Sequence, residues 1–391
     1  MEEIRLVDLK GQYDKISREI DRAVLDVIRS TAYINGPEVH AFAEELQAYL
    51  SVKHVIPCAN GTDALQIALM SLGLKHGDEV ITPSFTYIAT AEVIALLELK
   101  PVFAEVDKDT FVMTAETFEK AITAHTKAVI PVHLYGQCAE MEEILKIAAA
   151  NDISVIEDTA QALGAEYRFA NGTVKKAGTM GTLGCTSFFP SKNLGCYGDG
   201  GAVMTDDNSL YERISMVANH GQKRKYYHDI IGVNSRLDSI QAAILRVKLR
   251  HLDEYASARQ KVAEHYDNIL GGLNCIETPA RAENSTHVFH QYTLKLNDID
   301  RDGMQEYLSS RGIPSNIYYP LPIHRQLGFK EIIGDDVHLP LTEELCNKVL
   351  SLPVHTEMSK DQMNFITDAI YEFSESSPCH SENHQTNEGK T

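Results

Sequence analysis

The sequence predicts an α/β fold in which a mainly parallel sheet lies under helices. From about residue 54 to residue 215, short apolar runs typical of strands alternate with longer segments of helical periodicity. Alternation of this kind indicates βαβ units, because parallel neighbouring strands need a helical crossover. The predicted strands are Val80–Thr82, Pro101–Ala104, Ala128–Val132, Ile153–Ile156, Thr186–Phe189 and Ala202–Thr205.

Helical patterns flank this region on both sides. Residues 11–50 carry apolar side chains at helical spacing. After the alternating region, the expected elements are helices over Leu237–Leu249 and Leu252–Leu270, a strand over Gln291–Leu296 and a helix over 303–311. We therefore predict a large domain, 1–250, and a smaller α+β domain, 251–373. The polar tail, 374–391, lacks periodicity and is expected to be disordered.

Composition excludes several classes of function. With 391 residues, 43% hydrophobic and 23% charged, the chain reads as a soluble globular enzyme. The net charge of −19 argues against binding to nucleic acid or to an anionic membrane surface. The sequence has no membrane-spanning apolar run and no secretory signal, so we expect a cytoplasmic protein. Its seven cysteines are scattered without a C-x-x-C pair, which predicts neither a disulfide frame nor a metal site.

One lysine has an unusual setting. Lys192 lies in the loop Pro190–Gly195, after a predicted strand and before a glycine-rich turn at Gly198–Gly201. A lysine at the mouth of a sheet can lose its hydration, which lowers its pKa and frees the amine for Schiff-base chemistry. The alternative is a solvated loop lysine. For the glycines, a hairpin turn between two strands is the simplest interpretation.

A carboxylate follows another predicted strand. Asp158 stands at the carboxyl end of Ile153–Ile156, and ligands of open α/β sheets bind at that edge. A carboxylate there could keep the ring nitrogen of pyridoxal phosphate (PLP) protonated, so that the ring accepts electrons. The alternative is that Asp158 caps a following helix.

A third segment could bind phosphate. Gly61 and Thr62 open a strongly helical pattern, and the N-terminus of a helix attracts anions. Ser187, shortly before Lys192, could add a hydroxyl donor. Tyr87, after a predicted strand, could stack on a flat ring. The alternatives are an ordinary capped helix and a core tyrosine.

Taken in order along the chain, these segments resemble one family. They are Gly61-Thr62, Tyr87, Asp158 to Gln161, Ser187 to Lys192 and Gly232 to Asp238. The set is similar to that of the PLP-dependent sugar aminotransferases of the DegT/DnrJ/EryC1/StrS family, and the similarity covers roughly residues 3 to 372. Some members carry histidine in place of the lysine and act as dehydratases. Because this chain has Lys192, the aminotransferase branch is favoured.

The resemblance implies fold type I of the PLP enzymes and a role for each matching residue. Lys192 would form the Schiff base, Asp158 would face the pyridine nitrogen and Gln161 would bind the 3-hydroxyl. Gly61, Thr62 and Ser187 would hold the phosphate, and Tyr87 would stack on the ring. Asn234 of the partner subunit would reach the same phosphate, so the resemblance also implies a homodimer.

The identity of the amino-group acceptor is inferred from residues in the predicted loops. Three runs, Cys58–Leu69, Thr186–Gly201 and Gly232–Leu245, look closest to enzymes that aminate C3 of UDP-2-acetamido-2-deoxy-3-oxo-D-glucuronate with glutamate, for bacterial surface polysaccharides. A basic stretch, 220–228, could bind the nucleotide diphosphate, and the alternative is a solvated loop. Arg236 is a further candidate for an anionic group of the substrate. The resemblance implies that Tyr318, Tyr319 and His324 lie near the sugar, and the alternative for at least one of the two tyrosines is core packing. Alternatives are a nucleotide-linked 4-keto-6-deoxy sugar as acceptor, a sugar dehydratase or a non-catalytic regulator.

Overall fold

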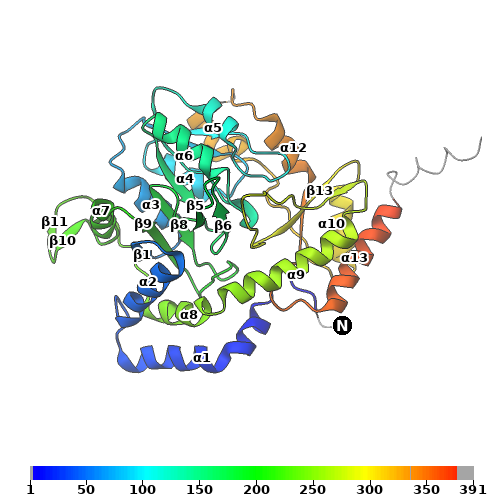
Figure 1. The fold of residues 1–391 in the computed structure, drawn as a ribbon, viewed down its shortest axis with the longest axis horizontal. Coiled ribbons are helices and arrows are strands. Elements are labelled where there is room, and N and C mark those ends of the chain that lie inside the picture. The colour runs from blue at the N-terminus through cyan, green and yellow to red at the C-terminus, as the bar shows by residue number, and fades with distance from the viewer. Residues whose placement is uncertain (1–2, 335, 377–391) are drawn as a thin grey trace, which may run out of the picture.

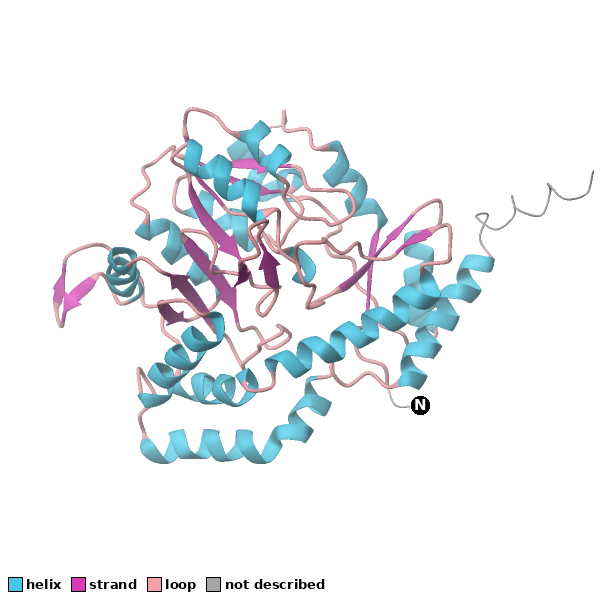
Figure 2. Ribbon diagram, in the orientation of Figure 1, coloured by secondary structure: helices cyan, strands magenta, loops and turns pink. Residues whose placement is uncertain are grey.

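The computed structural model describes residues 3–334 and 336–376, and its centre is a seven-stranded sheet (Figure 2). Every strand of this sheet except β9 runs in the same direction, because β9 is antiparallel to both of its neighbours. The predicted mainly parallel α/β fold is therefore confirmed. In spatial order the strands are β1 (His54–Cys58), β9 (Gly201–Thr205), β8 (Leu183–Ser187), β5 (Ser154–Asp158), β4 (Thr126–Val129), β2 (Glu79–Pro83) and β3 (Lys100–Ala104).

Helices cover both faces of this sheet, since alternate side chains along a buried strand point to opposite faces. On β2, Val80 packs in the core beneath α3, α4 and α7, whereas Ile81 packs on the other face, under α5 and α6. Ala202 and Met204 of β9 pack with α2 and α8. The covering helices are α2 (Pro37–Leu50), α3 (Gly61–Ser71), α4 (Ala89–Leu96), α5 (Ala115–Ala121), α6 (Met141–Ala150), α7 (Asn208–Ala218) and α8 (Ser239–Leu249).

A smaller core lies beside the large sheet. The long helix α9 leads from α8 to this core (Figure 1), where a three-stranded antiparallel sheet packs against helices. Its elements are α9 (Leu252–Leu270), β12 (Ile276–Glu277), β13 (Tyr292–Leu296), α10 (Arg301–Ser310), β14 (Val349–Leu352) and α13 (Lys360–Glu375). The expected helix and strand at 252–270 and 291–296 are present, and the division at residue 250 stays a prediction.

Several expectations from the sequence differ from the structure. The strand expected over Ala128–Val132 begins at Thr126 and ends at Val129. The strand expected over Thr186–Phe189 ends at Ser187, because the chain then enters the loop that carries Lys192. The strands β8 and β9 do form an antiparallel pair in which Ser187 faces Gly201, so the turn is the whole intervening loop and not the glycines alone. Disorder was expected from residue 374, but Ser374 is buried in α13, a helix with a capping box at Ser359. The rest of that tail, 377–391, lies outside the described residues.

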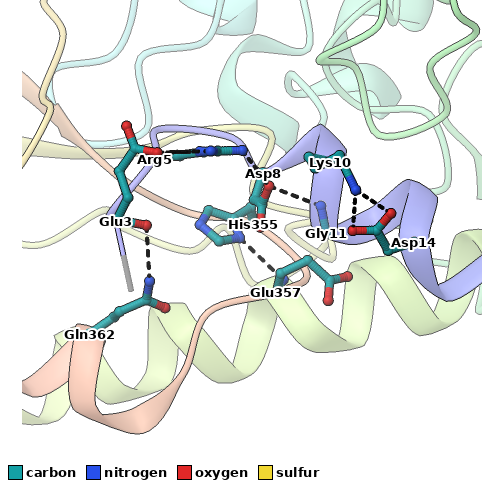
Figure 3. A network of polar contacts seen from close by, with 9 residues as sticks. All are labelled: Glu3, Arg5, Asp8, Lys10, Gly11, Asp14, His355, Glu357 and Gln362. Carbon is teal, nitrogen blue, oxygen red and sulfur yellow. Dashed lines mark hydrogen bonds and ion pairs between the residues drawn. The ribbon is translucent and has the colours of Figure 1, made fainter. Parts of the chain in front are cut away.

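The N-terminal segment joins helix α1 (Leu9–Ser30) to the smaller core (Figure 3). Ile4 is buried in that core, and the Gln362 side chain donates a hydrogen bond of 3.4 Å to the backbone oxygen of Glu3. Arg5 forms ion pairs with Glu3 and with Asp8, and Asp8 caps the first turn of α1. Because α1 also packs against α8 through Ile16 and Ile20, this segment links the two cores.

The remaining elements are short. A two-stranded hairpin, β10 with β11, projects from the body beside α7 (Figure 1). The short elements, with this hairpin included, are β6 (Glu166–Arg168), β7 (Val174–Lys176), β10 (Gln222–Arg224), β11 (Tyr227–His228), α11 (Leu327–Ile333), α12 (Pro340–Lys348) and the 3-10 helices η1 (Leu134–Gly136) and η2 (Ile323–Arg325). Within the described residues, no helix is both long and apolar enough to cross a membrane.

Candidate active site

The carboxyl ends of the parallel strands gather the predicted site residues. Asp158 is the last residue of β5, and Ser187 is the last residue of its neighbour β8. Lys192 lies in the loop that leaves β8, and Gly61 begins the helix after β1. The edge of the sheet therefore brings together residues that are more than a hundred positions apart in the sequence.

The carboxylate of Asp158 is buried, with 7% of the residue exposed. Its Oδ2 accepts a hydrogen bond of 2.9 Å from the hydroxyl of Thr90, and its Oδ1 accepts one of 3.1 Å from the backbone of Ala160. A series of turns, and no helix, follows Asp158, so the alternative that it caps a helix is wrong. Asp158 instead presents a fixed negative charge at the sheet edge.

The amine of Lys192 interacts electrostatically with the negative charge of Asp158. It makes no hydrogen bond with any residue that the structure describes. Burial lowers the pKa of Lys192 to about 8, and the negative charge of Asp158 opposes this shift only in part. A lysine in this state is readily deprotonated near neutral pH, as an attacking amine must be. The alternative of a fully solvated loop lysine is wrong.

The first turn of α3 has the features of a phosphate site. Asn60 caps the helix by accepting a hydrogen bond of 2.8 Å from the backbone of Asp63. In the described part of the chain, the backbone N–H groups of Gly61 and Thr62 have no hydrogen-bond partner. A Cβ at Gly61 would lie 2.6 Å from the Cβ of Ser187, so only glycine allows the two segments to approach.

The side chain of Gln161 is held between two tyrosines. Its Oε1 accepts a hydrogen bond of 2.8 Å from the backbone of Tyr135, and its Nε2 donates one of 3.1 Å to the hydroxyl of Tyr319. Tyr87 is 57% exposed, and its ring centroid lies 6.3 Å from that of Tyr319. Tyr87 is therefore not a core tyrosine, and its exposed ring is available to a flat ligand.

The residues predicted to contact the sugar have different surroundings. The hydroxyl of Tyr318 accepts a hydrogen bond of 2.8 Å from Asn316, while His324 is buried and has protein partners at both ring nitrogens. Arg236 is half-buried ahead of α8, next to the exposed Asn234. The substrate roles of Arg236, Tyr318, Tyr319 and His324 stay predictions, as does the cross-subunit role of Asn234.

A second buried carboxylate, not singled out in the sequence, supports the site. Glu157 is fully buried next to Asp158 and accepts a hydrogen bond of 2.8 Å from His133. It also accepts three backbone hydrogen bonds from residues 178–181, at 2.6 to 2.9 Å. Thr90 was missed as well. The only sequence signal for either residue was its place next to a predicted strand end or site residue, because their partners lie far away along the chain.

The residues of this edge fit PLP. An unpaired amine, a carboxylate, free N–H groups at a helix N-terminus and an exposed aromatic ring match its aldehyde, ring nitrogen, phosphate and ring face. Within the described residues, no cluster of three or more His, Cys, Asp or Glu side chains could hold a metal ion. This combination of fold and side chains defines a fold type I, PLP-dependent enzyme.

Comparison with known proteins identifies the family. The model of the DegT/DnrJ/EryC1/StrS aminotransferase family matches residues 14–371. The UDP-2-acetamido-2-deoxy-3-oxo-D-glucuronate aminotransferase of Pseudomonas aeruginosa is 44% identical over 94% of this chain and 99% of its own length. A pleiotropic regulatory protein of Geobacillus stearothermophilus is 44% identical over 95% of this chain and 98% of its own.

A solved structure leads to the same result. The crystal structure of DesV from S. venezuelae, in complex with a ketimine intermediate, superposes with a TM-score of 0.91 at 38% identity. The match covers 96% of this chain and 99% of DesV. The chain belongs to the DegT/DnrJ/EryC1/StrS aminotransferase family. It is a PLP-dependent sugar aminotransferase, as its sequence predicted.

Proposed function

We propose that this enzyme transfers an amino group from L-glutamate to C3 of UDP-2-acetamido-2-deoxy-3-oxo-D-glucuronate, for bacterial surface-polysaccharide synthesis. The observation that carries this proposal is the 44% identity with the Pseudomonas aeruginosa aminotransferase of that name, over nearly the full length of both chains. The site supports the reaction class, because it combines a deprotonatable lysine with a buried carboxylate.

In this proposal, Lys192 both anchors the cofactor and moves the proton. When bound, PLP supplies the electron sink that stabilises negative charge on the carbon losing its proton. The free amine of Lys192 would take this proton at Nζ and later return it. A pKa of about 8 allows Nζ to do both near neutral pH. Asp158, which accepts a hydrogen bond from Thr90, would stabilise positive charge on the ring nitrogen.

The phosphate site is completed by a second subunit. Gly61, Thr62 and Ser187 of one protomer would hold the phosphate, and Asn234 of the partner subunit would add a side-chain amide. Asn234 is exposed, and its backbone pairs with Asn219 at the base of the β10–β11 hairpin. An exposed, anchored amide can reach another chain, so we propose that the functional unit is a homodimer.

Positive charge for the nucleotide diphosphate comes from the β10–β11 hairpin and Arg236. Lys223, Arg224 and Lys225 are exposed on the hairpin, which stands away from the body of a chain whose net charge is −19 (Figure 1). Arg236 is half-buried on the same connection between α7 and α8. Such a local excess of cations favours a diphosphate.

Two further functions are kept as candidates. A nucleotide-linked 4-keto-6-deoxy sugar is the alternative acceptor, because the acceptor is selected by loops, which diverge among proteins of one fold. A regulatory role is the other, since the Geobacillus stearothermophilus relative is named a regulatory protein. Lys192 and Asp158 favour catalysis over regulation, and Lys192 also argues against a sugar dehydratase.

The first experiment is the absorption spectrum of the PLP-loaded protein before and after addition of L-glutamate without any sugar. We expect the yellow band of the bound cofactor to bleach and to return with 2-oxoglutarate. A yellow protein that glutamate leaves unchanged would exclude this donor. A protein that never becomes yellow would exclude Lys192 as the anchor.

The acceptor is tested on the glutamate-treated, colourless enzyme. We expect the yellow band to return on addition of UDP-2-acetamido-2-deoxy-3-oxo-D-glucuronate, with amino sugar formed in equal amount. A nucleotide-linked 4-keto-6-deoxy sugar, added in a parallel sample, should restore the band much more slowly. The reverse order of rates would replace the proposed acceptor by the alternative one.

A further inference from the structure

Ser84, His324 and Glu343 form a chain of hydrogen bonds beside the predicted sugar site. Ser84 directly follows β2, His324 lies in η2 and Glu343 lies in α12. The distance from Ser84 Oγ to His324 Nδ1 is 2.7 Å, and from His324 Nε2 to Glu343 Oε1 it is 3.0 Å. Ser84 is fully buried and His324 is 3% exposed, so neither can contact a ligand in solution without a rearrangement.

The protons of this chain can be assigned from its donors. The backbone N–H of His324 donates a hydrogen bond of 3.1 Å to Ser84 Oγ, which leaves the hydroxyl proton for Nδ1. The ring proton is then on Nε2 and points to Glu343. Burial lowers the pKa of His324, which favours this neutral form although Glu343 opposes the shift. Every polar atom is satisfied in one arrangement.

The Glu343 end of this hydrogen-bond chain is held against the large sheet. Glu105, which follows β3, accepts hydrogen bonds from the backbone of Leu341 at 3.0 Å and of Thr342 at 2.9 Å, in the first turn of α12. The charge of Glu343, one residue further on, is balanced by the guanidinium of Arg325 at 2.8 Å. These contacts hold Glu343 in place, and Glu343 in turn fixes the orientation of the His324 ring.

The contact between Ser84 and His324, at the other end of the hydrogen-bond chain, connects two segments that each carry a site tyrosine. Tyr87 lies three residues after Ser84, and Tyr319 lies five residues before His324. Besides the side-chain contact, the backbone N–H of Ile323 donates to the backbone oxygen of Ser84 at 3.1 Å. The two segments meet again where the rings of Tyr87 and Tyr319 lie 6.3 Å apart. Because Tyr87 is 57% exposed, its own packing constrains it little.

We infer that His324 is a positioning residue, which acts through Ser84 to set the spacing of the aromatic wall formed by Tyr87 and Tyr319. This inference rests on the proposed function, in which Tyr87 covers the cofactor ring and Tyr319 lies beside the sugar. It replaces the direct sugar contact that the sequence suggested for His324. Its physical basis is that both ring nitrogens of His324 are already bound to protein groups. His324 and Ser84 also hold together the two segments that carry the tyrosines, in addition to the hydrogen bond of 3.1 Å that Gln161 donates to the Tyr319 hydroxyl.

Two substitutions at His324 distinguish its hydrogen bond to Ser84 from its hydrogen bond to Glu343. In His324→Gln the amide nitrogen can reach the position of Nε2 and keep the bond to Glu343, whereas the bond to Ser84 is lost. In His324→Asn the amide oxygen can replace Nδ1 and keep the bond to Ser84. Ser84→Ala removes the side-chain bond that His324→Gln removes, and it also removes the bond that the backbone N–H of His324 donates to Ser84 Oγ. The double variant Ser84→Ala/His324→Gln should therefore resemble Ser84→Ala if the two residues act through their side-chain contact.

Three readouts are measured on the PLP-loaded protein and on apo protein titrated with PLP. They are the visible circular dichroism of bound PLP, the affinity for PLP, and KM for the sugar compared with the rate of bleaching by glutamate. We expect Ser84→Ala and His324→Gln to alter the dichroism, and to weaken PLP binding and raise the sugar KM by about fivefold, the worth of one hydrogen bond. His324→Asn should stay close to the wild type, and the double variant should match Ser84→Ala.

The matched control is Ser374→Ala, which removes another fully buried serine hydroxyl, one that donates to Ile370 at 2.8 Å in α13. If Ser84→Ala and His324→Gln change only the melting temperature, as the control is expected to do, the inference is wrong. Effects that add in the double variant would also overturn it. If Ser84→Ala does not fold, the two His324 variants decide alone. Failure of the proposed function is distinct, because the wild type itself would then bind no PLP or not respond to glutamate.

Discussion

Thr90 donates a hydrogen bond of 2.9 Å to Asp158 from a position 68 residues earlier in the chain. Thr90 is fully buried in the first turn of α4, so its hydroxyl is held in place by the core. The bond leaves Asp158 one orientation at the end of β5. A carboxylate fixed in this way needs no reorganisation when it acts on a bound ring, which is the basis of electrostatic preorganisation.

Replacing Thr90 by valine tests this relationship. Thr90→Val keeps the shape of the side chain and removes one hydrogen bond to a carboxylate, worth about 1.5–3 kcal/mol. We expect the rate of the glutamate half-reaction, followed by stopped-flow absorption, to fall about tenfold or more. Thr90→Ser, which keeps the hydroxyl, serves as the control and should retain most of the rate. Equal rates for the valine variant and the wild type would show that Asp158 is oriented without Thr90.

The anchoring lysine can be identified chemically. Lys192→Ala should yield no adduct with PLP after reduction with borohydride, whereas the wild type should give one, found by mass spectrometry on the peptide that contains residue 192. Lys248→Ala is the control, because Lys248 is also buried and its pKa is likewise lowered to about 8. A reducible adduct in Lys192→Ala would place the anchor elsewhere.

The buried charge of Lys192 should be visible in the stability of the apo protein. Its folded pKa of about 8 lies below the ordinary value of 10.5, so the folded state holds the proton less tightly. The resulting cost is complete below pH 8 and disappears as pH rises toward 10.5, because the unfolded chain then loses the proton as well. Lys192→Met should therefore be more stable than the wild type by about 2 kcal/mol at pH 7.

This difference should shrink as the pH approaches 10, and urea unfolding of the apo proteins at pH 7 and pH 10 measures it. The exposed Lys261, replaced by methionine, is the control for loss of a lysine at the surface. A gap between Lys192→Met and the wild type that is the same at both pH values would exclude the buried charge as its cause.

The cross-subunit role of Asn234 can be tested by mixing. Asn234→Ala alone should lose PLP faster than the wild type, and Lys192→Ala alone should be inactive. In a mixed dimer, one of the two sites combines Lys192 of one subunit with Asn234 of the other, so random pairing restores about a quarter of the sites. Activity at limiting PLP measures this recovery. If Asn234 acts on its own subunit, no such site forms and mixing should restore nothing.

Reversal of charge at Arg236 should separate the two half-reactions. Arg236→Glu is expected to raise KM for the nucleotide sugar at least tenfold, because a carboxylate would then face a diphosphate. Bleaching by glutamate should keep its wild-type rate. Arg18→Glu on the exposed side of α1 is the control for the change in net charge. A defect confined to the glutamate step would refute the role of Arg236 in sugar binding.

Much of the fold could be predicted because the local spacing of apolar residues indicates its strands and helices. The strand expected at Ala202–Thr205 and the helix at Leu252–Leu270 agree with the structure to within a residue. The errors arose where the tertiary structure gives a local sequence pattern a role different from its usual one. Thr186–Phe189 is apolar beyond the end of its strand because Phe188 is buried under α2, next to Phe42. Asp158 resembles a helix cap, but the chain turns after it.

By itself, the sequence determined the class of this protein. A lysine in a polar loop, a carboxylate at a strand end and a glycine at a helix start are local patterns. As part of an ordered set of motifs they resemble the DegT/DnrJ/EryC1/StrS family, and that resemblance implied a PLP-dependent aminotransferase. The tertiary structure alone decided which buried groups pair. Asp158 with Thr90, Glu157 with His133, and Ser84 with His324 are 68, 24 and 240 residues apart. Such pairs depend on the order of the strands and on the packing of the smaller core, and no local pattern encodes either.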